Sequence, residues 1–192
     1  EVARGVLTFL ADTQATDLDD ARDAQPGKIL HEMRGGEMAA LGEIPFGRYY
    51  GSADATPLFV MLAAQYFERT GDQGTIESLW PHIVAALDWM VEYGDIDGDG
   101  FIEYARQSDT GLVQQGWKDS YDSIFHADGR LADAPIAMCE IQAYAYAAWR
   151  GAAELAIARG DHGAADTWRA RAEAVRERFE ERFWCDELGT YA

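Results

Sequence analysis

Apolar residues recur at helical spacing through the middle of the chain. Residues 55–70 (ATPLFVMLAAQYFERT) follow this pattern, with Ser52 or Asp54 available to cap the N-terminal end. A second amphipathic segment, residues 75–94, begins after a connection of only four residues, 71–74. Because so short a connection forces two helices to run antiparallel, the pattern predicts an αα-hairpin.

A second pair of helices is predicted in the C-terminal half. Residues 135–158 and 164–183 both carry apolar positions at steps of three and four, and a tight turn at residues 159–163 connects them. One further helix is predicted at residues 3–15. The predicted fold class is therefore all-α, built from αα-hairpins.

The connections between the predicted helices differ strongly in length. The hairpin turns are short, whereas residues 17–51 and 94–134 form long stretches without helical periodicity. Connections longer than about 15 residues in a compact domain usually carry function. We therefore expect the functional residues to lie in these two stretches.

The charge of the chain narrows the classes of partner. The 192 residues include 16 lysines and arginines against 34 aspartates and glutamates, a formal net charge of −18. Such a balance argues against nucleic acid, which needs a basic surface to bind phosphates. No apolar run approaches the length of about 20 residues that a membrane span requires. Two cysteines make no disulfide framework, so a cytoplasmic location is expected.

An aspartate-rich turn follows the second predicted helix. Asp95, Asp97 and Asp99 stand at positions 1, 3 and 5 of a pattern that begins like a calcium-binding EF-hand loop, with Gly100 at position 6. Position 12, where the bidentate glutamate belongs, is Arg106. The turn is therefore either a calcium site or an ordinary Gly/Asp turn after a helix.

Two further segments combine carboxylates with aromatic residues. In GWKDSYDS, Asp119 and Asp122 follow Trp117, and a carboxyl beside a large apolar ring can have a raised pKa, as a general acid needs. A solvated acidic loop would show the same spacing. In RYYGSADATP, Asp54 fits either a helix N-cap or a polar group that holds a ligand. HEMRG lacks the second histidine of HExxH, which argues against a zinc protease.

Several motifs in one order resemble a known family. GKILHEMRGG, IPFGRYYGSADATPLFV, DGDGFIEY, GWKDSYDSI and APIAMCEIQAYAYAA together resemble the C-terminal domain of glycogen-debranching, amylo-α-1,6-glucosidase-like proteins, over roughly residues 27–148. The resemblance implies a six-hairpin (α/α)6 toroid that cleaves α-glucosidic linkages of α-glucans or oligosaccharides with inversion. We expect residues 1–192 to form one partial catalytic domain, an incomplete part of this ring.

The resemblance also implies roles for individual residues. Asp119 matches the general acid, and Asp54 matches an aspartate that binds sugar hydroxyls at the cleavage subsite. Many relatives carry arginine before the latter aspartate, where this chain has Ala53. Other positions match residues that line the family's sugar pocket and bind substrate: Tyr49, Tyr50, Trp117, Lys118 and Glu140.

The general base of the pair is expected outside this chain. In such toroids it comes from a hairpin near the C-terminal end of the ring, and an inverting pair needs its two carboxyls about 6.5–9.5 Å apart. We expect a carbohydrate substrate, no cofactor and no nucleic acid or membrane partner. An alternative is a non-catalytic helical-hairpin module that binds carbohydrate or protein.

Overall fold

The computed structural model describes residues 1–44, 47–118 and 120–192. These residues are mostly helical, and they include four two-residue strands. In chain order the elements are α1 (Val2–Asp12), the 3-10 turn η1 (Asp20–Arg22), α2 (Glu37–Ala40), α3 (Ala55–Thr70), α4 (Gln73–Glu92), β1 (Glu103–Tyr104), β2 (Ile136–Ala137), α5 (Cys139–Ala158), α6 (His162–Phe183), β3 (Trp184–Cys185) and β4 (Thr190–Tyr191). The predicted all-α class is confirmed.

Two αα-hairpins, α3/α4 and α5/α6, contain the four longest helices of the described residues. The same device starts the second helix of each pair. Asp72 Oδ1 accepts a hydrogen bond from Thr75 N at 3.1 Å, and Asp161 Oδ1 accepts one from Ala164 N at 3.0 Å. These side chains satisfy N–H groups that have no partner within the helix. Because α4 packs against α3 and α6 packs against α5, both predicted hairpins are confirmed.

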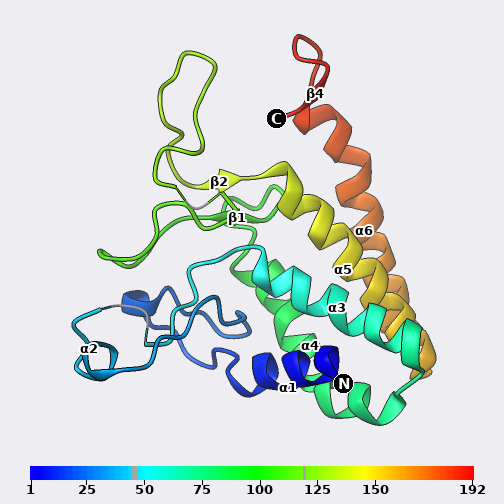
Figure 1. The fold of residues 1–192 in the computed structure, drawn as a ribbon. Helices are drawn as coiled ribbons and strands as arrows, with labels where there is room; N and C mark the ends of the chain where they lie inside the picture. The colour runs from blue at the N-terminus through cyan, green and yellow to red at the C-terminus, as the bar shows by residue number, and fades with distance from the viewer. Residues whose placement is uncertain (45–46, 119) are drawn as a thin grey trace.

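The first helices of the two hairpins pack against each other. α3 and α5 lie side by side, α4 lies against α3, and α6 lies against α5 (Figure 1). A small residue allows the close approach, because a Cβ added to Gly151 would stand 2.5 Å from the Cβ of Ala64. The core between the helices contains fully buried side chains such as Val60, Ile83 and Ile141.

Both α3 and α5 begin at the same end of the molecule. Figure 1 shows their N-terminal ends facing the described parts of the long connections, residues 13–44, 47–54, 93–118 and 120–138, which lie together on that side. At the other end the hairpin turns are short. The asymmetry expected from the sequence is therefore present, and it places the connections over the N-termini of two parallel helices.

The predicted helix boundaries at 75–94 and 164 shift by two residues, to Gln73–Glu92 and His162, and two other boundaries shift further. The helix predicted from residue 135 begins at Cys139, because Ile136 and Ala137 pair as strand β2 with β1, in the register Tyr104↔Ile136. The helix predicted over residues 3–15 ends at Asp12, because Ala15 instead exchanges backbone hydrogen bonds with residues 27 and 28. In both cases, backbone pairing with a distant segment replaces a helical turn.

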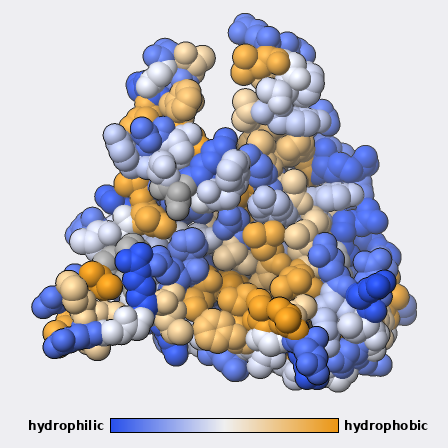
Figure 2. All heavy atoms as spheres, viewed as in Figure 1, coloured by the Kyte–Doolittle hydropathy of each residue, from blue (hydrophilic) through white to orange (hydrophobic). Residues whose placement is uncertain are grey.

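One face of the molecule is markedly apolar. Figure 2 shows hydrophobic side chains gathered over the middle of the view, where α1 and α3 lie. A groove between α3 and α5 has a volume of about 600 Å³ and is lined largely by apolar residues, among them Met61, Phe67 and Leu155. Within the described residues, no helix combines the length and apolar character that crossing a membrane requires.

Candidate functional site

The start of α3 holds Asp54 in a fixed position. Ser52 rather than Asp54 caps the helix, because Ala55 N donates to Ser52 Oγ at 3.1 Å. The Ser52 hydroxyl in turn donates to Asp54 Oδ1 at 2.5 Å. A carboxylate has about four acceptor positions, so the half-buried Asp54 retains acceptors for a ligand. Of the two capping residues that the sequence allowed, the structure uses the serine.

A backbone hydrogen bond connects the start of α3 to the segment that precedes Trp117. Ala53 N donates to Gln115 O at 2.7 Å, and both residues are buried. Ala53 is the position where many relatives of the predicted family carry arginine. Here it has 1% of its surface exposed and serves to join two loops.

The loop that carries GWKDS lies against the start of α5. Trp117 Nε1 donates to Glu140 Oε1 at 3.2 Å, and the indole remains 59% exposed. Lys118 Nζ lies 5.2 Å from the centroid of the same ring, in cation–π contact. Three predicted substrate-binding residues are thus brought together. The arrangement combines an exposed aromatic surface, an ammonium group and a carboxylate.

The environment of Glu140 keeps its carboxylate ionised. Burial alone would raise the pKa of Glu140, but hydrogen bonds from its own backbone N–H, the Cys139 thiol and the Trp117 indole outweigh burial. Together with the charge of Lys118, they hold the pKa of Glu140 below its ordinary value. The position in the first turn of α5 also favours a negative charge. At neutral pH Glu140 is therefore a hydrogen-bond acceptor and not a proton donor.

The predicted general acid, Asp119, lies outside the described residues. Its neighbours in the sequence, Trp117, Lys118 and Ser120, are described. The catalytic assignment of Asp119 stays a prediction.

The two predicted pocket tyrosines are buried by the loops themselves. Tyr49 is fully buried, and its hydroxyl donates to Asp23 Oδ2 at 2.7 Å and accepts from Leu112 N at 2.7 Å. Burial, with the carboxylate of Asp23 beside it, raises the pKa of Tyr49 well above its usual range. Tyr50 is 3% exposed and donates to Thr13 O at 2.7 Å. In this chain both hydroxyls hold loops in place, and a contact of either with sugar stays a prediction.

Asp23 is a central residue that the sequence gave no reason to select. Its buried carboxylate accepts hydrogen bonds from Tyr49 Oη, Gln107 N and Ser108 N. Its backbone adopts φ 51°, a left-handed conformation that aspartate tolerates better than most residues. Its partners stand 26, 84 and 85 positions away in the sequence, so no local spacing could reveal it. Asp23 ties the two long connections to each other.

The aspartate turn brings its three carboxylates together. Single oxygens of Asp95, Asp97 and Asp99 lie within 4.8 Å of one another. Arg178 of α6 approaches this turn, with Nη2 at 3.7 Å from Asp99 Oδ2. Arg106, at the position of the missing glutamate, donates instead to Gly111 O at 3.2 Å. Calcium binding therefore stays one of two alternatives for this turn.

Comparison with protein families identifies the class of the domain. Residues 51–192 match the mannosylglycerate hydrolase MGH1-like glycoside hydrolase domain family. The match covers most of the chain and includes the starts of α3 and α5, where Asp54, Trp117, Lys118 and Glu140 lie. Comparison with curated proteins gives no match. The family match supports the predicted glycosidase and does not single out glycogen debranching. The chain belongs to the MGH1-like glycoside hydrolase domain family.

Proposed function

We propose that this chain carries the general-acid half of the active site of an inverting α-glycosidase. The proposed substrates are α-glucosidic linkages of α-glucans or oligosaccharides, as in amylo-α-1,6-glucosidases. Asp119 is the general acid, and the base is a second carboxylate outside this chain. The supporting observation is the hydrogen bond from Trp117 to Glu140, which fixes the loop before Asp119 against the start of α5.

Each described residue of the candidate site has a defined part in this proposal. The exposed Trp117 ring supports the apolar face of a sugar, since aromatic rings suit such surfaces. The anionic Glu140 accepts hydrogen bonds from sugar hydroxyls, as do the side-chain oxygens of Asp54, and Lys118 donates hydrogen bonds to them. Asp119 protonates the leaving glycosidic oxygen while the distant base activates water on the opposite face. The sugar is thereby oriented before the bond is cleaved.

The name of the matched family favours a second substrate. The family is named after a mannosylglycerate hydrolase. Mannosylglycerate is therefore a second candidate substrate, beside the α-glucosides. The two candidates differ in the group that leaves, which is glycerate in one case and a sugar in the other. A panel that contains maltose, isomaltose and mannosylglycerate distinguishes them by initial rates.

The decisive experiment replaces Asp119 with asparagine in the full-length natural protein. Asp119→Asn removes the donated proton at nearly constant volume, and we expect kcat to fall about 10²- to 10⁴-fold on the best substrate of the panel. Asp122→Asn, in the same loop and exposed, is the matched control and should retain activity. Activity at the wild-type level in Asp119→Asn, or equal losses in both variants, would contradict the assignment.

The stereochemistry of the product tests the mechanism separately. Proton NMR during early hydrolysis identifies the anomer released first. Inversion is expected, since the proposal contains water attack and no covalent glycosyl-enzyme intermediate. Retention would refute the inverting mechanism while leaving the glycosidase class intact. Failure of the full-length protein to hydrolyse any substrate would favour the non-catalytic binding module.

A further inference from the structure

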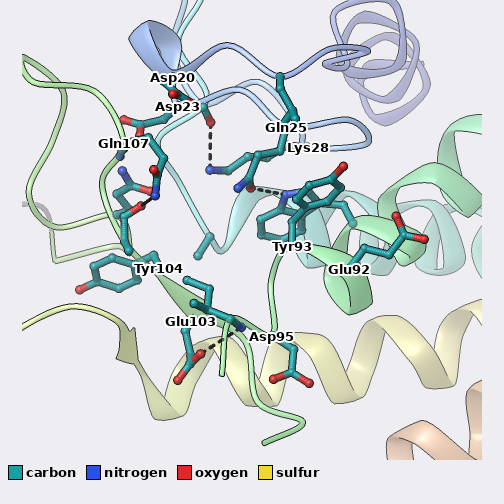
Figure 3. Close-up of a pocket in the computed structure, with 16 residues that line it drawn as sticks. Asp20, Asp23, Gln25, Lys28, Glu92, Tyr93, Asp95, Glu103, Tyr104 and Gln107 are labelled. Atoms are coloured by element: carbon teal, nitrogen blue, oxygen red, sulfur yellow. Dashed lines mark hydrogen bonds between the residues drawn. The ribbon is translucent and has the colours of Figure 1, made fainter. Parts of the chain in front are cut away.

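A cavity of about 370 Å³ lies between the C-terminal end of α4 and the two long connections. Its volume falls within the range of about 300–1,000 Å³ typical of small-molecule sites. None of the described residues that the sequence assigned to substrate binding lines it. Figure 3 shows Lys28 and Asp23 at one end of the cavity, and Glu103 and Asp95 at the other. The Lys28 amine must therefore be explained by its own end of the cavity.

Lys28 places a buried and weakly held ammonium group in the wall of this cavity. The residue is 5% exposed, and its Nζ donates to the backbone oxygen of Asp23 at 3.1 Å. Nζ also lies 5.5 Å from the centroid of the Trp89 ring. In the described part of the chain Lys28 forms no ion pair. An ammonium has three N–H donors, so the nitrogen retains capacity to react with or bind a molecule in the cavity.

Burial changes the acid–base behaviour of this amine. It lowers the pKa of Lys28 to about 8, although the charge of Asp23 partly opposes the effect. At pH 7 about one molecule in ten then holds the neutral amine, whereas an ordinary lysine, with a pKa of about 10.4, is neutral in about one in 2,500. Only the neutral amine has the lone pair that attacks an electrophile, and desolvated lysines form Schiff bases in enzymes. Lys28 is therefore a nucleophile near neutral pH.

The walls around Lys28 favour a small, uncharged hydroxy compound. Polar side chains line this end of the cavity (Figure 3): Asp20, Asp23, Gln25 and Gln107. Gln25 Oε1 accepts from Trp89 Nε1 at 2.8 Å, which leaves the Gln25 amide nitrogen to donate. Gln107 Nε2 donates to Ala105 O at 3.2 Å, which leaves the Gln107 amide oxygen to accept. A hydroxyl group suits both amides, whereas an anion would meet the negative charges of Asp20 and Asp23.

We propose that Lys28 is a covalent site for small uncharged hydroxyaldehydes, which it holds as a protonated imine. The neutral amine nitrogen forms a bond to the aldehyde carbon, and the aldehyde oxygen takes up protons and leaves as water. Overall, the ammonium and the aldehyde give the protonated imine and water, so no oxidant or reductant is consumed. The protonated imine keeps one N–H to donate to Asp23 O, and its positive charge stays near the Trp89 ring. The contacts that hold the ammonium therefore also hold the product.

The test compares the two lysines of this chain, Lys28 and Lys118, in the full-length natural protein. The protein is treated with glycolaldehyde at pH 7 and with cyanoborohydride, which reduces each imine to a stable amine. Peptide mass spectrometry then measures the modified fraction of each lysine over time. Lys118 is exposed and Lys28 is buried, so accessibility alone favours Lys118. We expect Lys28 to react at least about fivefold faster. Equal rates, or faster modification of Lys118, would overturn the proposal.

Two controls test whether the folded cavity causes the preference. In concentrated urea the two lysines should react at similar rates, and a preference for Lys28 that persists there would contradict the proposal. Glyoxylate is an aldehyde of the same carbon length that carries a carboxylate, and it should give a smaller ratio of Lys28 to Lys118 modification. A ratio as large as with glycolaldehyde would contradict the selection of uncharged compounds. These measurements do not depend on hydrolysis, so failure of the proposed catalysis is recognised independently.

Discussion

Replacing Lys28 with methionine should stabilise the protein. Methionine fills nearly the same volume, keeps contact with Trp89 and removes an ammonium that is almost fully buried. The native group forms a hydrogen bond to Asp23 O, which does not compensate for the loss of water around its charge.

The magnitude follows from the pKa of Lys28, which burial lowers from 10.5 to about 8. At about 1.4 kcal/mol per tenfold change in the equilibrium, the buried charge costs about 3 kcal/mol at pH 7. The variant also loses the hydrogen bond to Asp23 O, and this loss offsets about 1 kcal/mol of the stability gained. A net gain of about 2 kcal/mol in the free energy of unfolding is expected for Lys28→Met.

The pH dependence has a defined sign. Between pH 8 and 10.5 the unfolded chain holds a proton on Lys28 that the folded chain has lost, so the wild type gains stability as the pH rises. The methionine variant lacks this contribution. Urea unfolding of both proteins at pH 7 and pH 10 should show their difference narrowing by about 2 kcal/mol. A variant less stable than wild type at pH 7, or a difference independent of pH, would refute the reasoning.

Three further predictions concern the loops. Gly27→Ala should lower the free energy of unfolding, measured with urea, by more than about 2 kcal/mol, because φ is +87° and the new Cβ would clash with Ala85 O. Gly129→Ala is the matched control: φ is +84° but the surroundings are open, so the loss should be about 1 kcal/mol. Asp23→Ala should lower the melting temperature far more than Asp23→Asn, which keeps an acceptor for Gln107 N and Ser108 N. Equal effects of the two variants would contradict the inference that these hydrogen bonds hold the two long connections together. With Arg178 beside Asp99, we expect millimolar calcium to leave the melting temperature unchanged, and a rise would favour the calcium alternative.

The helices could be predicted from the sequence because their information is local. Residues 55–70 were expected as a helix and are one, since apolar residues at steps of three and four need only one neighbouring surface to bury. The start of α5 and the end of α1 could not be predicted. There the backbone pairs with segments far along the chain, as Ile136 does with Tyr104. Such pairing depends on the position of a partner that helical periodicity does not contain.

The candidate site was predictable to a different degree. Motif resemblance selected Trp117, Lys118 and Glu140, and the structure brings them into contact. Motif resemblance also placed Tyr49 and Tyr50 in a pocket, but it could not tell that both hydroxyls are used by other loop groups. A residue type at a matching position indicates which chemistry is present, whereas its partners depend on how the loops fold.

The sequence by itself determined an acidic, all-α chain of αα-hairpins with long connections at one end and glycosidase-like motifs within them. Only the tertiary structure decided what those connections do. It joined Asp23 to residues more than 80 positions away and enclosed Lys28 and Glu103 around a cavity. Helical periodicity is a property of neighbouring residues. Burial, by contrast, depends on every segment that packs over a group, and burial decides which buried charges are costly.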